Sequence, residues 1–410
     1  MDICIVAGQP SPRSLLSCRQ KSVKPALKVD ESPHPAIHFP SLVRTAHTMT
    51  MSIFNSISRA LFTVGLLAIS QFSLADSTVT KERTTTKLAE GIYEIRHPDA
   101  PDTFPQGNTT VIIGKRAVLV VDSCLLPSST RQDIAQIRQW TSLPVTYLVN
   151  THWHFDHTLG NATYAEAFPA IQIIASRPTQ KIIGDYNPGV LTRYPSRAQR
   201  FQQVLDTGKD LNGETIGETV RKEYEKALAG LGPVAEEFKT AHQLAPNVSF
   251  EHELDIDLGD RPVRILFLGR ANTAGDTVVY LPNDKLVATG DVLDHPVPYM
   301  FGGFPVDFVN TLRELAAIDA NIFVPGHGDV QHDKTYITQV IDLMQSVNTE
   351  VEKEINDGKT LEEAQTQVPK ALESKGWKEK FAGKNDDDQS FFDESFAGLV
   401  KSSYNQIKAR

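Results

Sequence analysis

The sequence predicts an α/β fold in which strands and helices form layers. Short apolar runs that are typical of buried strands alternate with segments that carry apolar residues at helical spacing. Such alternation is the pattern of proteins with helices packed on sheets. The composition agrees with a folded protein, because 40% of the 410 residues are hydrophobic and 22% are charged. This length suits one large domain with additions, or two domains.

The expected elements follow one another regularly in the first half of this fold. Residues 128–140 carry apolar side chains at helical spacing, and residues 145–149 are a short apolar run, so we expect a helix and then a buried strand. Similar patterns predict three earlier strands, a short helix and a further strand, at 92–95, 108–113, 117–121, 162–168 and 171–175. The strand pattern resumes after a long interruption, at 263–268, 277–281, 285–288 and 321–324.

Two segments are expected to be helical additions to the layered domain. Residues 178–247 interrupt the strand pattern, are rich in proline, glycine and charge, and contain helical stretches near 197–205 and 218–228. We interpret them as an inserted lid or cap. Residues 335–410 are the second addition, a helical C-terminal region that opens with an amphipathic helix at 335–355.

The first 75 residues differ from the rest and predict an export signal. Residues 49–75 combine an early Arg59, a short apolar middle and the small residues Ser73 and Ala75, which is the pattern of a signal peptide cleaved after Ala75. Residues 1–48 are an uncertain leader or a mis-called start. The apolar stretch is shorter than the roughly 20 residues that a membrane span needs, so no stable membrane anchor is expected. The expected location is periplasmic or secreted.

Charge and cysteine content exclude several other classes of protein. The formal net charge is −9, without a block rich in lysine and arginine, so a nucleic-acid partner has no electrostatic support and a small-molecule substrate fits better. Cleavage after Ala75 would leave Cys124 alone among three cysteines, so no intramolecular disulfide is expected. Nothing in the sequence indicates the oligomeric state.

Four metal-competent side chains follow the strand expected at 145–149. They are His152, His154, Asp156 and His157. Imidazole nitrogen together with carboxylate oxygen suits Zn²⁺, and the His-x-His pair can reach one ion while the Asp-His pair reaches a second. Histidines crowded on one loop would repel one another if protonated and gain little as structural residues. The segment is therefore interpreted as a metal site.

Three later segments each place a possible ligand just past an expected strand. They contribute Asn272 in a glycine-containing turn, Asp291 in Thr-Gly-Asp, and His327 in Gly-His-Gly. Strand ends converge at one edge of a sheet. We therefore expect these three side chains to lie close to the histidine cluster.

Together these motifs resemble those of the metallo-β-lactamase superfamily. The chain has His-x-His-x-Asp-His, a turn with Gly269, Thr273, Gly275 and Asp276, then Thr-Gly-Asp and a late Gly-His, spread over about residues 87–333. The resemblance implies a four-layer αβ/βα sandwich with a binuclear metal site at one edge. The helical insertion and the helical C-terminal region are then additions to that fold.

The resemblance also implies which metal each ligand binds. It divides six ligands between two metals and a bridge: His152 and His154 for the first metal, Asp156, His157 and His327 for the second, and Asp291 for both. Asn272 stands where the family usually has a third histidine for the first metal. Its amide offers only a neutral oxygen, which is a weaker zinc donor than imidazole. We expect one or two Zn²⁺ ions, with the second site stronger and Asn272 a weak or absent ligand.

Zinc would supply the chemistry. It lowers the pKa of bound water to about 7 and so provides hydroxide at neutral pH. Asp156 or Asp291 is the expected catalytic carboxylate, which orients the hydroxide or moves its proton. The expected function is exported, zinc-dependent hydrolysis of an ester, thioester, amide or lactam bond. The alternatives are β-lactam hydrolysis as the main activity, an iron-dependent oxidoreductase, and a non-catalytic metal-binding protein.

Residues near the motifs have further expected roles. The family keeps a buried aspartate behind its ligand histidines, so Asp122 is expected to hold a histidine through its second ring nitrogen. Cys124 is expected to be a buried thiol rather than a ligand. His295 is expected on the surface or in a pocket wall rather than as a substitute ligand. Three aromatic side chains either line the substrate pocket or pack in the core: Tyr299, Phe301 and Phe304.

Overall fold

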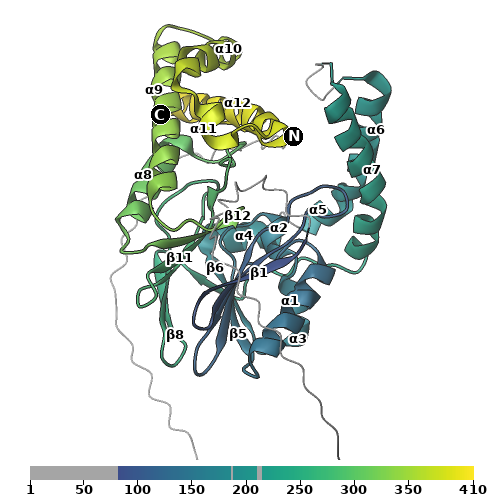
Figure 1. The fold of residues 1–410 in the computed structure, drawn as a ribbon, viewed down its shortest axis with the longest axis vertical. Helices are drawn as coiled ribbons and strands as arrows, with labels where there is room; N and C mark the ends of the chain where they lie inside the picture. Colours follow the sequence, from purple (N-terminus) through teal and green to yellow (C-terminus); the bar gives the residue numbers. More distant parts are fainter. Residues whose placement is uncertain (1–81, 186–187, 210–214) are drawn as a thin grey trace, which may run out of the picture. The chain divides into compact units, whose positions relative to one another are not determined.

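The computed structural model describes residues 82–185, 188–209 and 215–410. The leader expected at 1–48 and the signal peptide expected at 49–75 lie outside these residues and stay predictions. The described residues form a seven-stranded sheet and a five-stranded sheet with helices on their outer faces (Figure 1). The predicted α/β layer fold is confirmed.

In the first sheet the strands follow the order of the chain from β1 to β7. The first four strands are antiparallel neighbours, whereas β4, β5, β6 and β7 are parallel. Parallel neighbours need crossover connections, and helices α1 (Pro127–Trp140) and α3 (Asn161–Ala167) lie in two of them. The strands are β1 Thr84–Ala89, β2 Ile92–Arg96, β3 Thr109–Ile113, β4 Val118–Val121, β5 Val145–Val149, β6 Gln172–Ser176 and β7 Val248–Phe250.

The second sheet has the order β12-β11-β10-β9-β8. Its strands β8 to β11 are antiparallel, and the last pair, β11 and β12, is parallel and joined through helix α8 (Pro305–Ala317). The strands are β8 Glu253–Asp257, β9 Pro262–Leu266, β10 Val278–Leu281, β11 Leu286–Asp294 and β12 Ile322–His327.

The alternation of side chains along the strands explains the layers. On β4, Leu119 and Val121 enter a core shared with residues of the second sheet, whereas Val118 and Val120 pack with Ile134 and other residues of α1 and α3. The second sheet repeats the pattern, because its outer face packs with α8 and the C-terminal helices. The order of layers is helix, sheet, sheet, helix, as the resemblance implied.

The two helical additions contain the predicted helices. Helices α6 and α7 of the insertion run side by side (Figure 1). The insertion shares a small core with the layered domain, in which Tyr194, Val234 and Phe238 pack with Leu125 and Leu159. Its elements are α4 Arg177–Asp185, α5 Pro188–Arg193, the 3-10 turn Tyr194–Ser196, α6 Arg197–Thr207 and α7 Glu218–Phe238. The C-terminal helices join the outer core of the second sheet and are α9 Thr335–Asn356, α10 Leu361–Leu372, α11 Trp377–Ala382 and α12 Asp386–Lys408, with a 3-10 turn at Glu373–Lys375. None of the described helices combines the length and apolar composition of a membrane span.

The structure corrects the boundary of one predicted strand and adds three strands that the sequence did not predict. Strand β11 continues through Asp294, so Asp291 lies within a strand rather than in a loop after it. Glycine at 290, with φ of 50°, interrupts the regular pairing of β11 with β12 and lets the strand continue irregularly. Strands β1, β7 and β8 were not predicted, because β7 is short and because β1 and β8 carry mostly polar, exposed side chains.

Candidate metal centre

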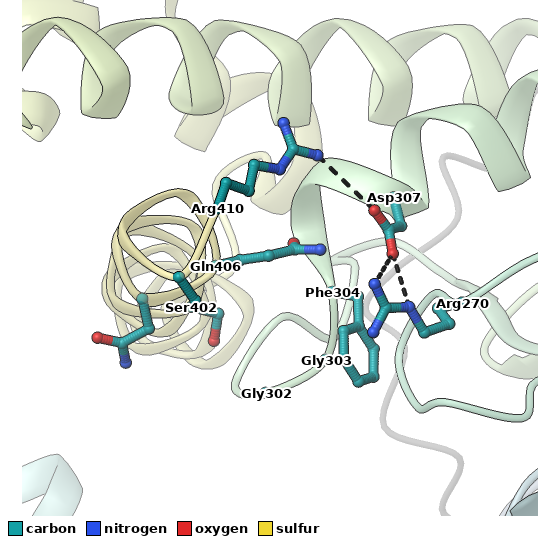
Figure 2. A pocket seen from close by; sticks show the side chains of 10 residues that line it. Arg270, Gly302, Gly303, Phe304, Asp307, Ser402, Gln406 and Arg410 are labelled. Atoms are coloured by element: carbon teal, nitrogen blue, oxygen red, sulfur yellow. Dashed lines mark hydrogen bonds and ion pairs between the residues drawn. The ribbon is translucent and has the colours of Figure 1, made fainter. Parts of the chain in front are cut away.

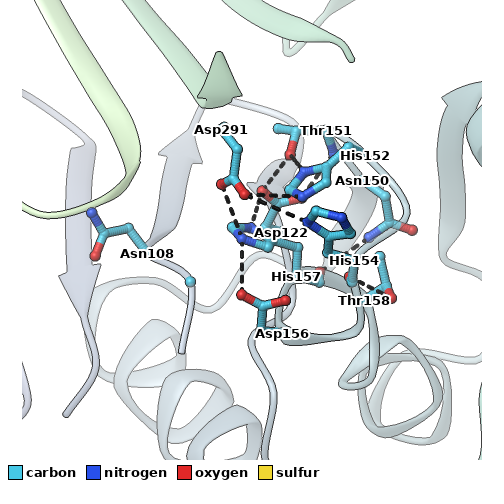
Figure 3. Close-up of polar contacts among 12 residues, drawn as sticks. Asn108, Asp122, Asn150, Thr151, His152, His154, Asp156, His157, Thr158 and Asp291 are labelled. Atoms are coloured by element: carbon cyan, nitrogen blue, oxygen red, sulfur yellow. Dashed lines mark hydrogen bonds and ion pairs between the residues drawn. The ribbon is translucent and has the colours of Figure 1, made fainter. Parts of the chain in front are cut away.

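The predicted donors gather at one edge of the two sheets. The segment with His152, His154, Asp156 and His157 directly follows β5, and the last two of these residues lie on the short helix α2 (Phe155–Thr158). Asp291 comes from β11, and His327 is the last residue of β12. Both sheets therefore contribute donors, and Figure 3 shows the imidazole and carboxylate groups of the first segment turned toward Asp291.

Four donor atoms form the group expected for the second metal. His157 Nε2 lies 3.4 Å from Asp156 Oδ2, 3.1 Å from His327 Nε2 and 3.1 Å from Asp291 Oδ1. His327 Nε2 lies 3.2 Å from Asp156 Oδ2 and 3.9 Å from Asp291 Oδ1. Donors bound tetrahedrally to one zinc at about 2.0–2.2 Å lie roughly 3.3–3.6 Å apart. The spacing of these atoms therefore fits a single metal ion.

The other carboxylate oxygen of Asp291 faces the group expected for the first metal. Its Oδ2 lies 3.1 Å from His152 Nε2 and 3.8 Å from His154 Nδ1. The Asn272 amide nitrogen lies 3.3 Å from the same oxygen and donates a hydrogen bond to it. Asp291 thus divides its two oxygens between the groups, which is the geometry of a bridging ligand. Asn272 would have to turn its carbonyl oxygen inward to bind a metal.

Replacement of Asn272 with histidine is expected to raise the metal content toward two ions per chain. The imidazole would supply a third nitrogen donor for the first metal. Changes in residues that only hold the ligands already shift metal affinity by roughly 10–100-fold, so a new ligand should shift it by at least as much. Metal counting after dialysis at graded free zinc measures the effect. The exposed Asn310 on α8 provides the control variant Asn310→His, which should leave the content unchanged. An unchanged content in Asn272→His would contradict the weak first site.

The buried donors carry charges that support one another. Burial alone would raise the pKa of Asp291, but His152 and His157 lower it well below its usual range. Burial opposes protonation of His157, yet Asp291 and Asp156 raise its pKa well above the ordinary value. The metal-free centre therefore holds protons between carboxylates and imidazoles, and a metal ion would displace them on binding. Solvent reaches the centre through His154 and His327, whose side chains are 20% and 24% exposed.

Asp122 orients two residues of the histidine segment, as the sequence predicted. Its Oδ1 accepts the backbone N–H of Thr151 at 2.8 Å, and its Oδ2 accepts the Thr151 hydroxyl at 2.7 Å and His157 Nδ1 at 3.0 Å. With its hydroxyl hydrogen given to Asp122, Thr151 can accept from His152 Nδ1 at 3.0 Å. Both histidines then keep a proton on Nδ1, so that Nε2, once a metal displaces the proton there, would offer its lone pair to the metal.

Close backbone packing fixes the walls of the centre. A Cβ atom on Gly107 would lie 2.4 Å from the His157 ring, and one on Gly326 would lie 2.0 Å from Asp291 Oδ1, so both positions require glycine. Buried His97 holds the first wall, because it bonds the carbonyl of Gly107 through Nδ1 at 2.8 Å and Asp133 through Nε2 at 2.9 Å.

The insertion is anchored beside the same centre. Buried Asp102 accepts hydrogen bonds from the Tyr194 hydroxyl at 2.5 Å and from Arg197 Nη1 at 3.0 Å. The ring of Tyr194 also packs at 5.9 Å on that of Phe155, which directly precedes Asp156. The insertion thus supports the segment that carries the donors.

Several side chains near the motifs take the places that the sequence predicted or left open. Cys124 is fully buried, and its thiol donates to Gln106 Oε1 at 3.0 Å. His295 turns to Asp329, with 3.6 Å from Nδ1 to Oδ2, and so lies outside the two donor groups. Tyr299 lies beside the centre, with its ring 5.8 Å from that of His154.

One donor-like residue had no sequence signal. Asp294 is buried, pairs in register with His327 across β11 and β12, and forms a cluster with His327 and Asp291. Burial and the charge of Asp291 raise the pKa of Asp294 well above its usual value. Its surroundings therefore favour the neutral form of this carboxyl over the charged form. Only the register of the parallel strand pair, which the sequence does not reveal, places it there.

A separate pocket of about 530 Å³ is lined by Arg270, Phe304 and residues at the end of α12. Figure 2 shows Arg270 and Arg410 meeting at Asp307 on its wall, with Gln406 and Ser402 of α12 opposite. None of the six predicted metal donors lines it. Arg270 and Arg410 pair with Asp307 there, and the pocket is distinct from the candidate metal centre.

Comparison with known proteins supports the resemblance stated from the motifs. Residues 102–327 match the family model described as the metallo-beta-lactamase superfamily. A linear primary-alkylsulfatase from Pseudomonas sp. is 23% identical over 266 residues, a match that covers 62% of this chain and 48% of that protein. The chain thus spans about half the length of this relative.

A solved alkylsulfatase structure shares the fold. The stereoselective inverting sec-alkylsulfatase Pisa1 from Pseudomonas sp. superposes with a TM-score of 0.54 at 14% identity, over 79% of this chain and 50% of that one. A metallo-beta-lactamase from Pontibacter korlensis superposes with a TM-score of 0.47 at 16% identity, over 64% of this chain and 99% of that one.

Proposed function

The chain belongs to the metallo-beta-lactamase superfamily, and we propose that it is a metal-dependent hydrolase whose metal is zinc and whose substrate is an ester-type small molecule. The observation that carries the proposal is the division of the Asp291 carboxylate, with one oxygen beside the donors of each metal. A donor set that combines histidine nitrogens with carboxylate oxygens suits zinc better than calcium or magnesium, which prefer oxygen ligands alone.

The residues of the centre divide the work of hydrolysis. A bound zinc ion would lower the pKa of a water molecule and polarise the bond to be cleaved. Asp156 and Asp291 keep low pKa values beside the histidines, so they stay ionised at neutral pH and can accept or orient the proton of the attacking water. Partly exposed His154 and His327 mark the side from which the substrate arrives.

Two alkylsulfatase matches favour the ester of sulfuric acid within this class. One is the relative that matches 62% of the chain, and the other is a solved structure that matches 79% of it. We propose an alkyl sulfate ester as the first substrate to test. Carboxylic esters, thioesters, amides and lactams use the same attack by water and belong in the same panel.

Removal of zinc is expected to abolish hydrolysis, and restoration of zinc to recover it. The test is a panel of alkyl sulfates, carboxylic esters, thioesters, lactones and β-lactams, assayed with the metal-counted protein before and after chelation. Iron in the purified protein, or zinc without turnover of any substrate, would contradict the proposal and favour oxidoreduction or passive metal binding. Turnover that persists after complete chelation would also contradict it.

We also propose that the active form is exported after cleavage behind Ala75. The support is the pattern of charge, apolar run and small residues within 49–75. Determination of the N-terminal residue of the protein recovered from the cell envelope or medium tests it. A protein that keeps residues 49–75 inside the cell would contradict export.

A further inference from the structure

Tyr299 lies beside the metal centre without a role in holding metal. Its ring contacts the ring of His154 at a centroid distance of 5.8 Å and an interplanar angle of 70°. It follows β11, the strand that supplies Asp291. Its side chain is partly exposed, so it stands between the donors and the solvent.

The Tyr299 hydroxyl keeps its proton at neutral pH, because the ordinary pKa of a tyrosine side chain is about 10. Among the residues that the structure describes, this hydroxyl has no hydrogen-bond partner. A neutral phenol beside the centre can therefore donate its O–H to an acceptor on a bound molecule.

The C-terminal helix α12 determines where Tyr299 stands. Ser395 of α12 donates its hydroxyl to the carbonyl of Pro298 at 2.7 Å, on the residue before Tyr299. Gly398 packs against the next two residues, because a Cβ there would lie 2.8 Å from Phe301 Cα and 3.0 Å from the carbonyl oxygen of Met300. The loop is therefore held on both sides of Tyr299 by one helix.

We propose that the Tyr299 hydroxyl donates a hydrogen bond to the substrate oxygen that gains negative charge as the bond breaks, and that α12 positions it for this purpose. The proposal rests on the hydrolase function stated above. It gives the C-terminal helical region a part in the reaction. A donor aimed at developing charge acts most strongly in the transition state, so its loss should lower kcat more than it raises KM.

The variant Tyr299→Phe removes the hydroxyl and keeps the ring. We expect kcat to fall about 100-fold, the usual scale for loss of one such donor, with an unchanged zinc content and melting temperature. The variant Tyr280→Phe is the matched control, because that hydroxyl bonds the carbonyl of Asp319 in an exposed region. A second readout needs no turnover: inorganic phosphate should bind the zinc-loaded Tyr299→Phe variant about tenfold more weakly than the parent.

The outcomes separate the two proposals. The parent protein could hydrolyse nothing in the panel and still bind phosphate more tightly than Tyr299→Phe does. That result would contradict the proposed function but support Tyr299 as a contact for an anion. Equal kcat and equal phosphate affinity in parent and variant would overturn that role. Loss of zinc or of stability in Tyr299→Phe would overturn it too, because the tyrosine would then be a structural residue.

The role of α12 is tested by a change in bulk at Gly398. Gly398→Ala forces the backbone of Phe301 away, so kcat and phosphate affinity should fall in the same direction as in Tyr299→Phe, although alanine favours the helix. The neighbouring exposed Ala397 provides the control Ala397→Leu, which adds bulk toward solvent. Parent-like kinetics in Gly398→Ala would overturn the positioning role of the helix.

Discussion

Replacement of Asp291 with alanine is expected to abolish hydrolysis and to remove most of the bound metal. Its two oxygens lie 3.1 Å from His152 Nε2 and 3.1 Å from His157 Nε2, so a single substitution weakens both donor groups. Even contacts one shell outside the ligands change affinity by about 10–100-fold. Loss of a bridging ligand should cost more than that, because both donor groups lose one of their oxygens.

Metal counting and the rate of hydrolysis measure this effect in parallel. Asp291→Asn keeps the shape and removes the charge, so it separates a need for charge from a need for space. The control is Asp319→Ala, at a carboxylate that is 80% exposed and pairs with Lys285 away from the centre. Full metal content in both Asp291 variants would show that the bridge is assigned to the wrong residue.

Donors that are close together in the chain were easier to predict from the sequence than donors that are far apart. His152, His154, Asp156 and His157 lie within one short segment, so their joint purpose is visible without a fold. Asp291 and His327 needed both the strand-end argument and the resemblance, since they are distant in sequence and each alone is common. The structure brings all six together, whereas Asp294 emerged only from the register of β11 with β12.

Whether a strand could be predicted from the sequence depended on how deeply it is buried. Apolar runs such as 145–149 identify strands covered on both faces, because burial imposes the pattern. Strand β8 reads Glu-Leu-Asp-Ile-Asp and is largely exposed at the sheet edge, so its charged residues conceal it. The place of Tyr299 depends on contacts with α12, about a hundred residues further along, which no local pattern contains.

Replacement of Asp122 with alanine is expected to destabilise the protein as well as its metal site. Asp122 is 2% exposed and accepts three hydrogen bonds, from the Thr151 N–H, the Thr151 hydroxyl and His157 Nδ1. Alanine would leave these donors buried without acceptors, at about 1–3 kcal/mol each where water cannot enter. Its backbone has a φ of 60°, which alanine tolerates less well than aspartate. We expect the free energy of unfolding to fall by several kcal/mol, measured by denaturant titration.

The variant Asp122→Asn separates the loss of stability from a second role of Asp122, which is to decide which ring nitrogen of His157 carries the proton. Asparagine has the same size and tolerates the same φ, so the fold should survive. The asparagine amide nitrogen can take one of two positions. It faces either the Thr151 N–H, which places two hydrogen-bond donors against each other, or His157 Nδ1. In the second arrangement His157 accepts the bond through Nδ1 and moves its proton to Nε2, the atom that faces Asp291. Zinc affinity should then fall about 10–100-fold or more in a folded protein. Parent-like affinity would show that Asp122 holds the loop without selecting the tautomer of His157.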